Sequence, residues 1–306
     1  MTSTVPYAIQ AEGLDKNFGR FHALSGLDLR VRRGEVHGFL GPNGAGKSTA
    51  IRILLGMMRR SGGRAEIFGR DVWRDRVGLH RHLAYVPGDV ALWPSMTGGQ
   101  CIDLLLRMRG LHGRGAAPHR DEAIERFDLD PTKKAKTYSK GNRQKVALVA
   151  AFAAPVDLLV LDEPTSGLDP LMEAVFQDHV AEATARGSTV LLSSHILSEV
   201  ERLCQAVTII RSGTTVETGL LTDLRRRTSS AVIAEVERPG ADLGRIPGVT
   251  DVEWRERTVR LAVSPEGLQP LVDCLSRAGV TSLRVEEASL ENLFMRHYET
   301  AEGKAE

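Results

Sequence analysis

Residues 35–49 read Glu-Val-His-Gly-Phe-Leu-Gly-Pro-Asn-Gly-Ala-Gly-Lys-Ser-Thr, and this stretch decides the fold. Segment 35–40 is short and mostly apolar without a helical period, which predicts a buried strand. Residues 49–58 predict a helix. Residues 41–49, at the junction, fit the pattern Gly-x-x-x-x-Gly-Lys-Ser/Thr of a phosphate-binding loop. That loop has to join a strand to a helix, and the predicted elements stand in this order.

Each part of the loop has a chemical reason. Its glycines allow backbone conformations closed to other residues, so that amides at the start of a helix can point at an anion. Lys47 can reach the β- and γ-phosphates of a nucleotide, and the Ser48 hydroxyl can ligate Mg²⁺. A glycine-rich turn that matches by chance is the alternative, which the strand–loop–helix context disfavours. The predicted phosphate-binding residues are Gly41, Pro42, Asn43, Gly44, Ala45, Gly46, Lys47, Ser48 and Thr49.

The composition is that of an ordinary globular protein. The 306 residues can form one large domain and one small domain. The net charge of +1 gives no electrostatic reason to expect a nucleic-acid partner. The three cysteines, Cys101, Cys204 and Cys274, are far apart, which favours reduced thiols in a cytosolic protein. The cysteines and histidines do not have the spacing typical of metal ligands.

The sequence has no recognisable targeting or membrane signal. Residues 1–6 have neither a basic start nor an apolar segment, so they do not predict a signal peptide. The longest apolar run, residues 146–156, contains Pro155 and is far shorter than the roughly 20 residues that span a bilayer. We therefore expect a soluble chain without a transmembrane segment of its own.

The region around the loop predicts a β-rich N-terminal subdomain. Its segments alternate polar and apolar side chains, as half-buried strands do. Residues 16–19 predict a turn that carries Phe18, and a core side chain is the simplest interpretation of Phe18 taken alone. The predicted strands of this region are 7–11, 27–31, 65–68 and 82–86.

Helical patterns interrupt the strands at about 96–154, and we expect this insertion to form a helical subdomain. Segments 157–162 and 189–194 are continuous apolar runs, which are typical of parallel strands buried on both faces. A helix at about 171–185 separates them. This alternation predicts an α/β fold with a mainly parallel sheet and ligand-binding loops at its carboxyl edge.

The composition shifts at about 220–228, where a run of arginines precedes Thr228. We place a domain boundary here, so that the predicted domains are 7–220 and 221–306. The second domain reads strand, short helix, strand, strand, helix, strand, helix, with the last helix at about 290–298. This order suggests a small ferredoxin-like α+β module, and no chemical motif is recognisable in it.

Further polar residues stand at the ends of predicted buried strands. Asp162 and Glu163 follow one strand, where the first carboxylate can hold Mg²⁺ and the second can orient or deprotonate water. A strand that ends in acids without any function is the alternative. His195 follows the next strand, at the same sheet edge as the loop, where it can contact a γ-phosphate. A lone histidine is more often structural than catalytic.

A second helix start is also a candidate anion site. Ser139, followed by Gly141, precedes an apolar helical segment and is a typical N-cap. The amides of such a helix start can face an anion. An ordinary N-cap is the alternative, and it would be preferred if this site stood alone. Residues 166–169, Ser-Gly-Leu-Asp, come directly after the acid pair.

Taken together and in this order, the motifs resemble those of the ATP-binding cassette (ABC) transporter ATPase subunits. The resemblance covers about residues 7–220 and is specific, because five motifs recur in the order of that family. It implies the P-loop NTPase fold. The corresponding segments are 41–49 for Walker A, 139–142 for the signature, 158–163 for Walker B, 166–169 for the D-loop and His195 for the switch histidine.

The resemblance implies ATP and Mg²⁺ as cofactors and gives the site residues roles. Lys47 would hold the phosphates, Ser48 and Asp162 would hold Mg²⁺, Glu163 would activate water, and His195 would orient the γ-phosphate. Lys47, Glu163 and His195 are thus the predicted catalytic residues.

Three more residues acquire roles through the family. Phe18 matches the aromatic residue that stacks on adenine. Ser139 and Gly141 would face the γ-phosphate held by a second subunit, which implies an ATP-dependent dimer of nucleotide-binding domains. The family also implies a separate transmembrane permease, which would hold the chain at the cytoplasmic face of the membrane.

Two departures from the family pattern matter. Tyr138 and Lys140 replace the leucine and a glycine of the usual signature. The family's glutamine falls at Gly88, which has no side chain, and the adjacent Asp89 is a candidate substitute. Segments 85–88 and 138–141 and the terminal Ser-Leu-Glu-Asn-Leu-Phe at 289–294 are similar to the subfamily that exports drugs and antibiotics.

The sequence therefore predicts the ATP-hydrolysing subunit of a membrane exporter. A non-transport ABC ATPase acting on the ribosome or nucleic acid is the alternative. The single cassette, the lack of a long coiled-coil insertion and the lack of a basic surplus count against it. A third interpretation is a regulatory nucleotide-binding protein with little turnover, to which Gly88 lends some support.

Overall fold

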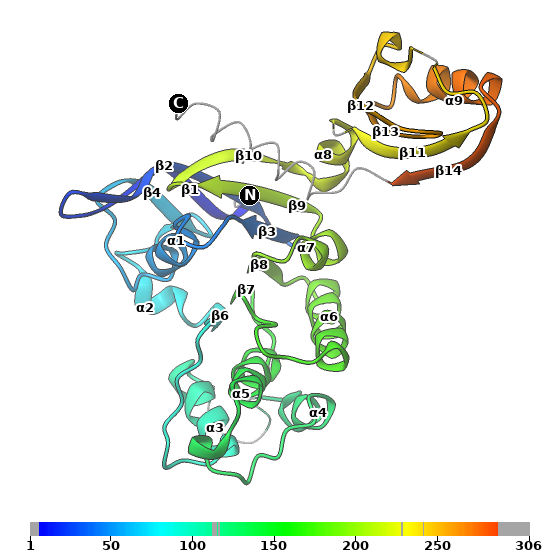
Figure 1. The fold of residues 1–306 in the computed structure, drawn as a ribbon. Helices are drawn as coiled ribbons and strands as arrows, with labels where there is room; N and C mark the ends of the chain where they lie inside the picture. The colour runs from blue at the N-terminus through cyan, green and yellow to red at the C-terminus, as the bar shows by residue number, and fades with distance from the viewer. Residues whose placement is uncertain (1–5, 112–114, 116, 228, 241, 287–306) are drawn as a thin grey trace. The chain divides into compact units, whose positions relative to one another are not determined.

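The computed structural model describes residues 6–111, 115, 117–227, 229–240 and 242–286. The chain forms two compact units, Met1–Thr218 and Gly219–Glu306 (Figure 1). Each unit has its own hydrophobic core. In the described part of the chain, no helix is both long enough and apolar enough to cross a membrane.

An antiparallel sheet of four strands opens the first unit, in the order β2-β1-β4-β5. The first two strands are longer than predicted, and the turn predicted at 16–19 is wrong in its position. Residues 16–18 belong to β1, and only Gly19 and Arg20 form the turn. Gly19 has a φ of +59°, which suits a two-residue hairpin. The strands are β1 (Tyr7–Phe18), β2 (Phe21–Arg32), β4 (Gly62–Ile67) and β5 (Arg70–Asp71).

The second sheet of this unit has six strands in the order β10-β9-β3-β8-β7-β6. Strands β9, β3, β8, β7 and β6 pair in parallel, which confirms the predicted α/β fold. Every residue of β3, β7 and β8 is buried, as continuous apolar runs predict. The strands are β3 (Val36–Leu40), β6 (Leu83–Val86), β7 (Leu158–Asp162), β8 (Thr189–Ser194), β9 (Ala206–Arg211) and β10 (Thr214–Leu220).

Helices connect these strands. The helix predicted at 49–58 starts earlier, at Lys47, and ends at Leu54, and Gly56 with a φ of +66° turns the chain away. Three helices, α3, α4 and α5, group together near β6 and β7 as the predicted helical insertion (Figure 1). The helices are α1 (Lys47–Leu54), α2 (Arg76–Leu79), α3 (Gly98–Met108), α4 (Arg120–Arg126), η1 (Ala135–Thr137), α5 (Lys140–Phe152), α6 (Pro170–Ala185) and α7 (Leu197–Leu203).

The two sheets of the first unit share one core. Side chains of β1 and β2, such as Ile9 and Leu29, pack in the same cluster as Phe39 of β3 and Ile51 of α1. The phosphate-binding loop leaves β3 and enters α1, so it is anchored at both ends in this cluster. Burial of large apolar side chains stabilises such an anchor by about 1.5–3 kcal/mol for each residue.

The second unit is a small α+β module. Its antiparallel sheet has the order β12-β13-β11-β14, and Leu271 and Leu275 of α9 belong to the core that the sheet forms. A short 3₁₀ helix, η2, stands where the first helix of the module was predicted. The predicted helix at 290–298 lies outside the described residues. The elements are α8 (Leu221–Arg227), β11 (Ser230–Val236), η2 (Leu243–Arg245), β12 (Val249–Arg255), β13 (Thr258–Val263), α9 (Leu268–Arg277) and β14 (Val280–Glu286).

Because the core clusters of the two units share no residue, we expect a chain that ends at residue 222 to fold by itself. Circular dichroism should show one cooperative thermal transition, close to the transition of the first unit in the full chain. A truncated chain that is insoluble, or that melts without cooperativity, would contradict independent folding.

Candidate functional site

The phosphate-binding loop has the geometry of an anion cradle. Gly44 and Gly46 adopt φ values of +83° and +106°, which are strained for any residue with a side chain. Gly46 is the N-cap of α1 and provides no side-chain cap. The first amides of α1 are therefore left to bind an external acceptor. A Cβ atom at Gly41 would lie 2.6 Å from the Ile210 carbonyl oxygen, so glycine is required there as well.

Lys47 lies folded over this loop. Its Nζ donates hydrogen bonds to the carbonyl oxygens of Gly41 at 2.5 Å and Pro42 at 3.2 Å, and it lies 4.0 Å from Glu163 Oε1. Burial lowers the pKa of Lys47, while the carboxylates of Glu163 and Asp162 act in the opposite direction. A buried cation that is held by neutral carbonyls is well placed to bind an anion.

Asp162 is the last residue of β7, lies close to Ser48 of the loop, and is almost fully buried. Burial raises the pKa of this carboxyl group, and the hydroxyls of Ser193 and Ser48 oppose that rise. Carboxylate and hydroxyl oxygens are ligands that Mg²⁺ prefers. In the described part of the chain, no group of three or more His, Cys, Asp or Glu side chains could hold a metal alone. The donor set therefore fits a Mg²⁺ ion that keeps water and substrate phosphates as its other ligands.

Glu163 has an unusual backbone for its residue type. Its φ is +49°, its amide donates to the Ser193 carbonyl oxygen at 2.8 Å, and its carbonyl oxygen accepts from the Ser166 amide at 3.2 Å. The side chain is partly exposed, and Oε1 lies 3.3 Å from His195 Nδ1. The structure thus brings together the three residues predicted to be catalytic, Lys47, Glu163 and His195.

The segment that carries His195 is itself fixed. The Ser194 hydroxyl donates to Oε2 of the buried Glu199 at 2.6 Å and accepts the Ile196 amide at 3.0 Å. His195 stays half exposed between these two residues. The backbone on both sides of the imidazole is held, while its ring faces the acid pair.

A cavity of about 260 Å³ lies over the loop. It is lined by Phe21 and Ala23 of β2, by Glu163, and by the loop residues Pro42, Asn43, Gly44, Gly46, Lys47, Ser48 and Thr49. Phe18, predicted from the family pattern to contact the base, does not line this cavity, whereas Phe21 does. The place of Phe21 beside the loop was not predicted from the sequence. The available signal was the short turn at Gly19, which brings a second aromatic residue opposite Phe18.

Gly88 lies against the acid pair. A Cβ atom built on it would be 3.1 Å from the Asp162 carbonyl oxygen and 3.5 Å from Glu163 Cβ. The position is therefore the one where the family's glutamine was expected, but without a side chain. The neighbouring Asp89 is exposed to solvent.

Ser139 and Gly141 do not line the cavity over the phosphate-binding loop of their own chain. Ser139 caps α5, since its Oγ accepts the Asn142 amide at 3.2 Å. A Cβ atom at Gly141 would lie 2.3 Å from the Gly167 carbonyl oxygen, so only glycine allows this approach. Lys140 Nζ donates to Ser166 Oγ at 2.6 Å. The signature and the segment after Glu163 are thus packed together at one place.

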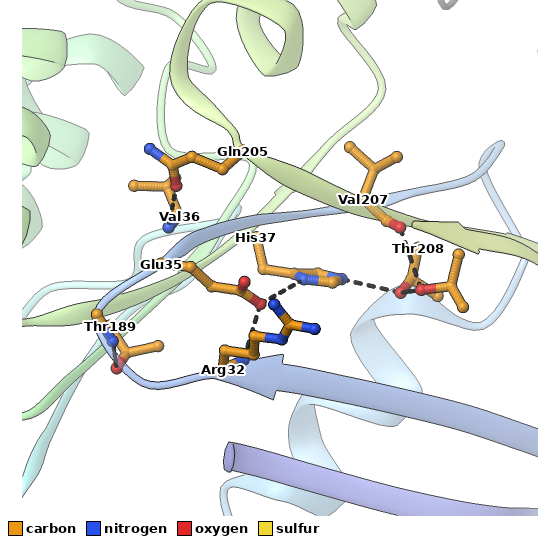
Figure 2. Close-up of polar contacts among 10 residues, drawn as sticks. Arg32, Glu35, Val36, His37, Thr189, Gln205, Val207 and Thr208 are labelled. Atoms are coloured by element: carbon orange, nitrogen blue, oxygen red, sulfur yellow. Dashed lines mark hydrogen bonds and ion pairs between the residues drawn. The ribbon is translucent and has the colours of Figure 1, made fainter. Parts of the chain in front are cut away.

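A polar network surrounds the start of β3, the strand that leads into the loop (Figure 2). His37 Nδ1 is 3.0 Å from Glu35 Oε1, and His37 Nε2 is 2.8 Å from Thr208 Oγ1 on β9. The Thr208 hydroxyl also forms a hydrogen bond with the Thr218 hydroxyl of β10, at 2.8 Å. Glu35 Oε1 also accepts the Arg32 amide at 2.7 Å. This network ties β3 to β9 and, through Thr218, to β10, and it was not predicted.

We expect Glu35→Gln to destabilise the first unit in a pH-dependent way. Burial alone would raise the pKa of Glu35, but the hydrogen bonds from His37 and the Arg32 amide outweigh it, so the pKa lies below its ordinary value. The stabilisation is therefore present above the ordinary glutamate pKa and is lost as pH falls through the lower folded pKa. The loss at neutral pH should be about 1 kcal/mol.

Urea unfolding at several pH values measures this effect. The exposed Glu125→Gln is the matched control and should leave the free energy of unfolding almost unchanged at each pH. A difference between Glu35→Gln and wild type that grows toward acid would contradict the assignment.

Comparison with known proteins shows the family to which the chain belongs. Residues 24–166 match the ABC transporter family. The chain is 35% identical over 299 residues to the daunorubicin resistance ATP-binding protein DrrA3 of Streptomyces coeruleorubidus, covering 94% of this chain and 95% of that protein. A solved ATP-binding subunit of an ABC transporter superimposes with a TM-score of 0.67 at 31% identity, covering 72% of this chain and 92% of the other.

A second solved structure is cbiO1 of Clostridium perfringens, described as part of the ABC transporter complex cbiONQ. It has a TM-score of 0.61 and 26% identity, and covers 72% of this chain and 92% of its own. The loop, the acid pair and these similarities together define an ABC-type ATPase. The chain belongs to the ATP-binding subunits of ABC transporters, which hydrolyse ATP to drive transport. The non-transport alternative gains no support from the matches.

Proposed function

We propose that Lys47, Glu163 and His195 carry out ATP hydrolysis at the carboxyl edge of the six-stranded sheet. The observation that supports this most is the position of Glu163, 4.0 Å from Lys47 Nζ and 3.3 Å from His195 Nδ1. Lys47 and the loop amides bind the phosphates, Glu163 accepts a proton from the attacking water, and His195 orients the γ-phosphate. Catalysis then consists mainly of positioning and charge stabilisation.

In this proposal, Ser48 and Asp162 hold Mg²⁺ beside the phosphates. The ion, when bound, supplies positive charge to the phosphate oxygens. The buried Asp162 carboxylate is kept close to the Ser48 hydroxyl by the start of α1 and the end of β7. Burial raises the pKa of Asp162, and a bound cation would oppose that rise because it would stabilise the charged carboxylate.

The proposed transport partner is a separate membrane permease, and the proposed cargo is a drug or an antibiotic-like compound. The relatedness to a daunorubicin resistance protein supports the cargo class.

An apolar cavity of about 250 Å³ lies between β6 and the helical insertion, lined among others by Pro87, Leu105, Ala147 and Ala151. It begins next to Gly88, so an apolar permease helix that enters it would act directly beside the acid pair.

This partner would hold the chain at the cytoplasmic face of the membrane, where ATP is present. Copurification of a polytopic protein with the chain from detergent-solubilised membranes tests the assignment.

Residues 7–220 form the nucleotide-binding domain in this proposal, and residues 221–306 are a small accessory domain that supplies none of the site residues.

The proposed active form is a dimer of nucleotide-binding domains. Ser139 and Gly141 belong to a helix start that can bind an anion, yet they lie outside their own chain's cavity. A second copy related by a two-fold axis would place the Ser139 loop of one chain over the Lys47 loop of the other. Each ATP would then be enclosed between two chains, with donors from both.

We expect Glu163→Gln to bind ATP as wild type does and to lose most hydrolysis, by 10²-fold or more on the scale of a lost general base. The amide has nearly the same shape but cannot accept a proton. Steady-state phosphate release and binding of a labelled nucleotide measure the two effects. Lys47→Ala is the reference variant, because it should lose binding as well. Similar turnover in Glu163→Gln and wild type would exclude the base role, while low turnover in both would favour the regulatory interpretation.

Mixing two inactive variants tests the shared site. Lys47→Ala removes the phosphate clamp, and Ser139→Arg blocks the signature with bulk and with a charge like that of Lys47. Each homodimer should be inactive. A mixed dimer contains one site with both defects and one site with neither, so the mixture should recover part of the wild-type hydrolysis.

Crosslinking shows whether mixed dimers have formed at the high concentration that unlinked partners require. Mixed dimers that remain inactive would mean that the sites are not shared or that both must be intact. Full activity of Ser139→Arg as a proven monomer would rule out the shared site.

A further inference from the structure

Glu199 is a buried carboxylate that does not line the cavity over the phosphate-binding loop. It belongs to the first turn of α7 and is only 7% exposed. Its Oε2 accepts a hydrogen bond from the Ser194 hydroxyl, while its Oε1 has no hydrogen-bond partner among the described residues. A buried carboxylate that is only half satisfied costs free energy, because its lost hydration is not fully replaced. The stability of α7 alone therefore does not account for an acid at this position.

This carboxylate supports the segment that carries His195. Ser194 is the last residue of β8, and its hydroxyl donates to Glu199 at 2.6 Å and accepts the Ile196 amide at 3.0 Å. Because the single hydroxyl proton points to Glu199, the oxygen lone pairs are left for the Ile196 amide. Glu199 thus fixes the direction of the Ser194 hydroxyl and, through it, the backbone on both sides of His195.

The same carboxylate acts on the segment that carries Glu163. Burial raises the pKa of Glu199, and the hydroxyls of Ser194 and Thr165 oppose that rise. Thr165 is itself buried and stands two residues after Glu163, in a turn where the Leu168 amide donates to the Thr165 carbonyl oxygen at 2.9 Å. The left-handed φ of +49° at Glu163 is strained and persists only where its surroundings hold it. The buried Thr165 beside a fixed carboxylate supplies such a hold.

We propose that Glu199 is a positioning residue, which holds the segments after β7 and β8 so that Glu163 Oε1 lies 3.3 Å from His195 Nδ1. This proposal rests on the roles given above to Glu163 and His195. Glu199 acts on the chemical step only through the two segments. Nucleotide binding relies on Lys47 and the loop amides, which follow β3, so it is expected to be independent of Glu199.

Steady-state ATP hydrolysis by the full chain tests the proposal. Glu199→Leu keeps a side chain of similar size but no acceptor, and its kcat should fall by about tenfold to hundredfold, the scale of a misplacement of about 1 Å. The KM for ATP and the binding of a labelled nucleotide should stay at their wild-type values. Glu199→Gln keeps one oxygen acceptor for the Ser194 hydroxyl and should recover most of the lost kcat.

Ser194→Ala separates positioning from a merely structural role. It removes the hydroxyl through which Glu199 reaches His195, so it should lower kcat, by no more than Glu199→Leu does. Because the two side chains act as a unit, the double variant should be no slower than Glu199→Leu. Its free energy of unfolding in urea should stay near that of wild type, because both polar partners are replaced by apolar groups. Glu201→Gln changes a carboxylate on the same helix and should leave kcat unchanged.

A wild-type kcat in Glu199→Leu, while Glu163→Gln is inactive, would overturn the positioning role and leave the roles of Glu163 and His195 intact. A wild-type kcat in Ser194→Ala would overturn it as well, so the test does not depend on the folding of Glu199→Leu. The proposal also fails if Glu199→Leu raises KM instead of lowering kcat, or if Glu199→Gln is as slow as Glu199→Leu. Similar turnover in Glu163→Gln and wild type would instead contradict the proposed hydrolysis roles, and the positioning role with them.

Discussion

The parallel pairing of β3, β8 and β7 is the constraint on which the ATP site depends. The register places Leu40 beside Ser194 and Asp162 beside Ser193. Three segments that are far apart in the sequence therefore leave the sheet at one level: the phosphate-binding loop, the acid pair and His195. A slip of one residue would turn every side chain of a strand to the opposite face. The complete burial of these strands makes such a slip costly. The packing of the core therefore also fixes the positions of the loop, the acid pair and His195.

Much of this arrangement could be predicted because its causes are local. Strands buried on both faces have to be continuous apolar runs, as at 158–162 and 189–194. The loop needs glycine at Gly44 and Gly46 because of their backbone angles, and that requirement leaves a motif. The acid pair and His195 follow such strands directly. Their proximity in space then follows from the rule that parallel strands present their carboxyl ends at one edge.

The rest could not be predicted, because it depends on distant partners or on a strand end. His37 looks like a stray polar residue in a buried strand until Thr208, 171 positions later, is seen to bond to it. The position of Phe21 depends on whether β1 ends before or after residue 16. Local propensity near Gly19 favoured the earlier end, whereas pairing with β2 extends the strand to Phe18. Residue boundaries of this kind are decided by the neighbouring strand.

The backbone of Glu163 has a consequence for how this chain can change. A left-handed φ of +49° costs a residue with a side chain roughly 1–2 kcal/mol, and glycine would avoid that cost. A glycine would also remove the carboxylate that lies between Lys47 and His195. Under the proposed role of Glu163 as the base, selection for thermal stability alone would favour glycine here and abolish turnover, and selection for turnover would oppose that change. Under that proposal, the position of the base is also one where stability and activity are traded against each other.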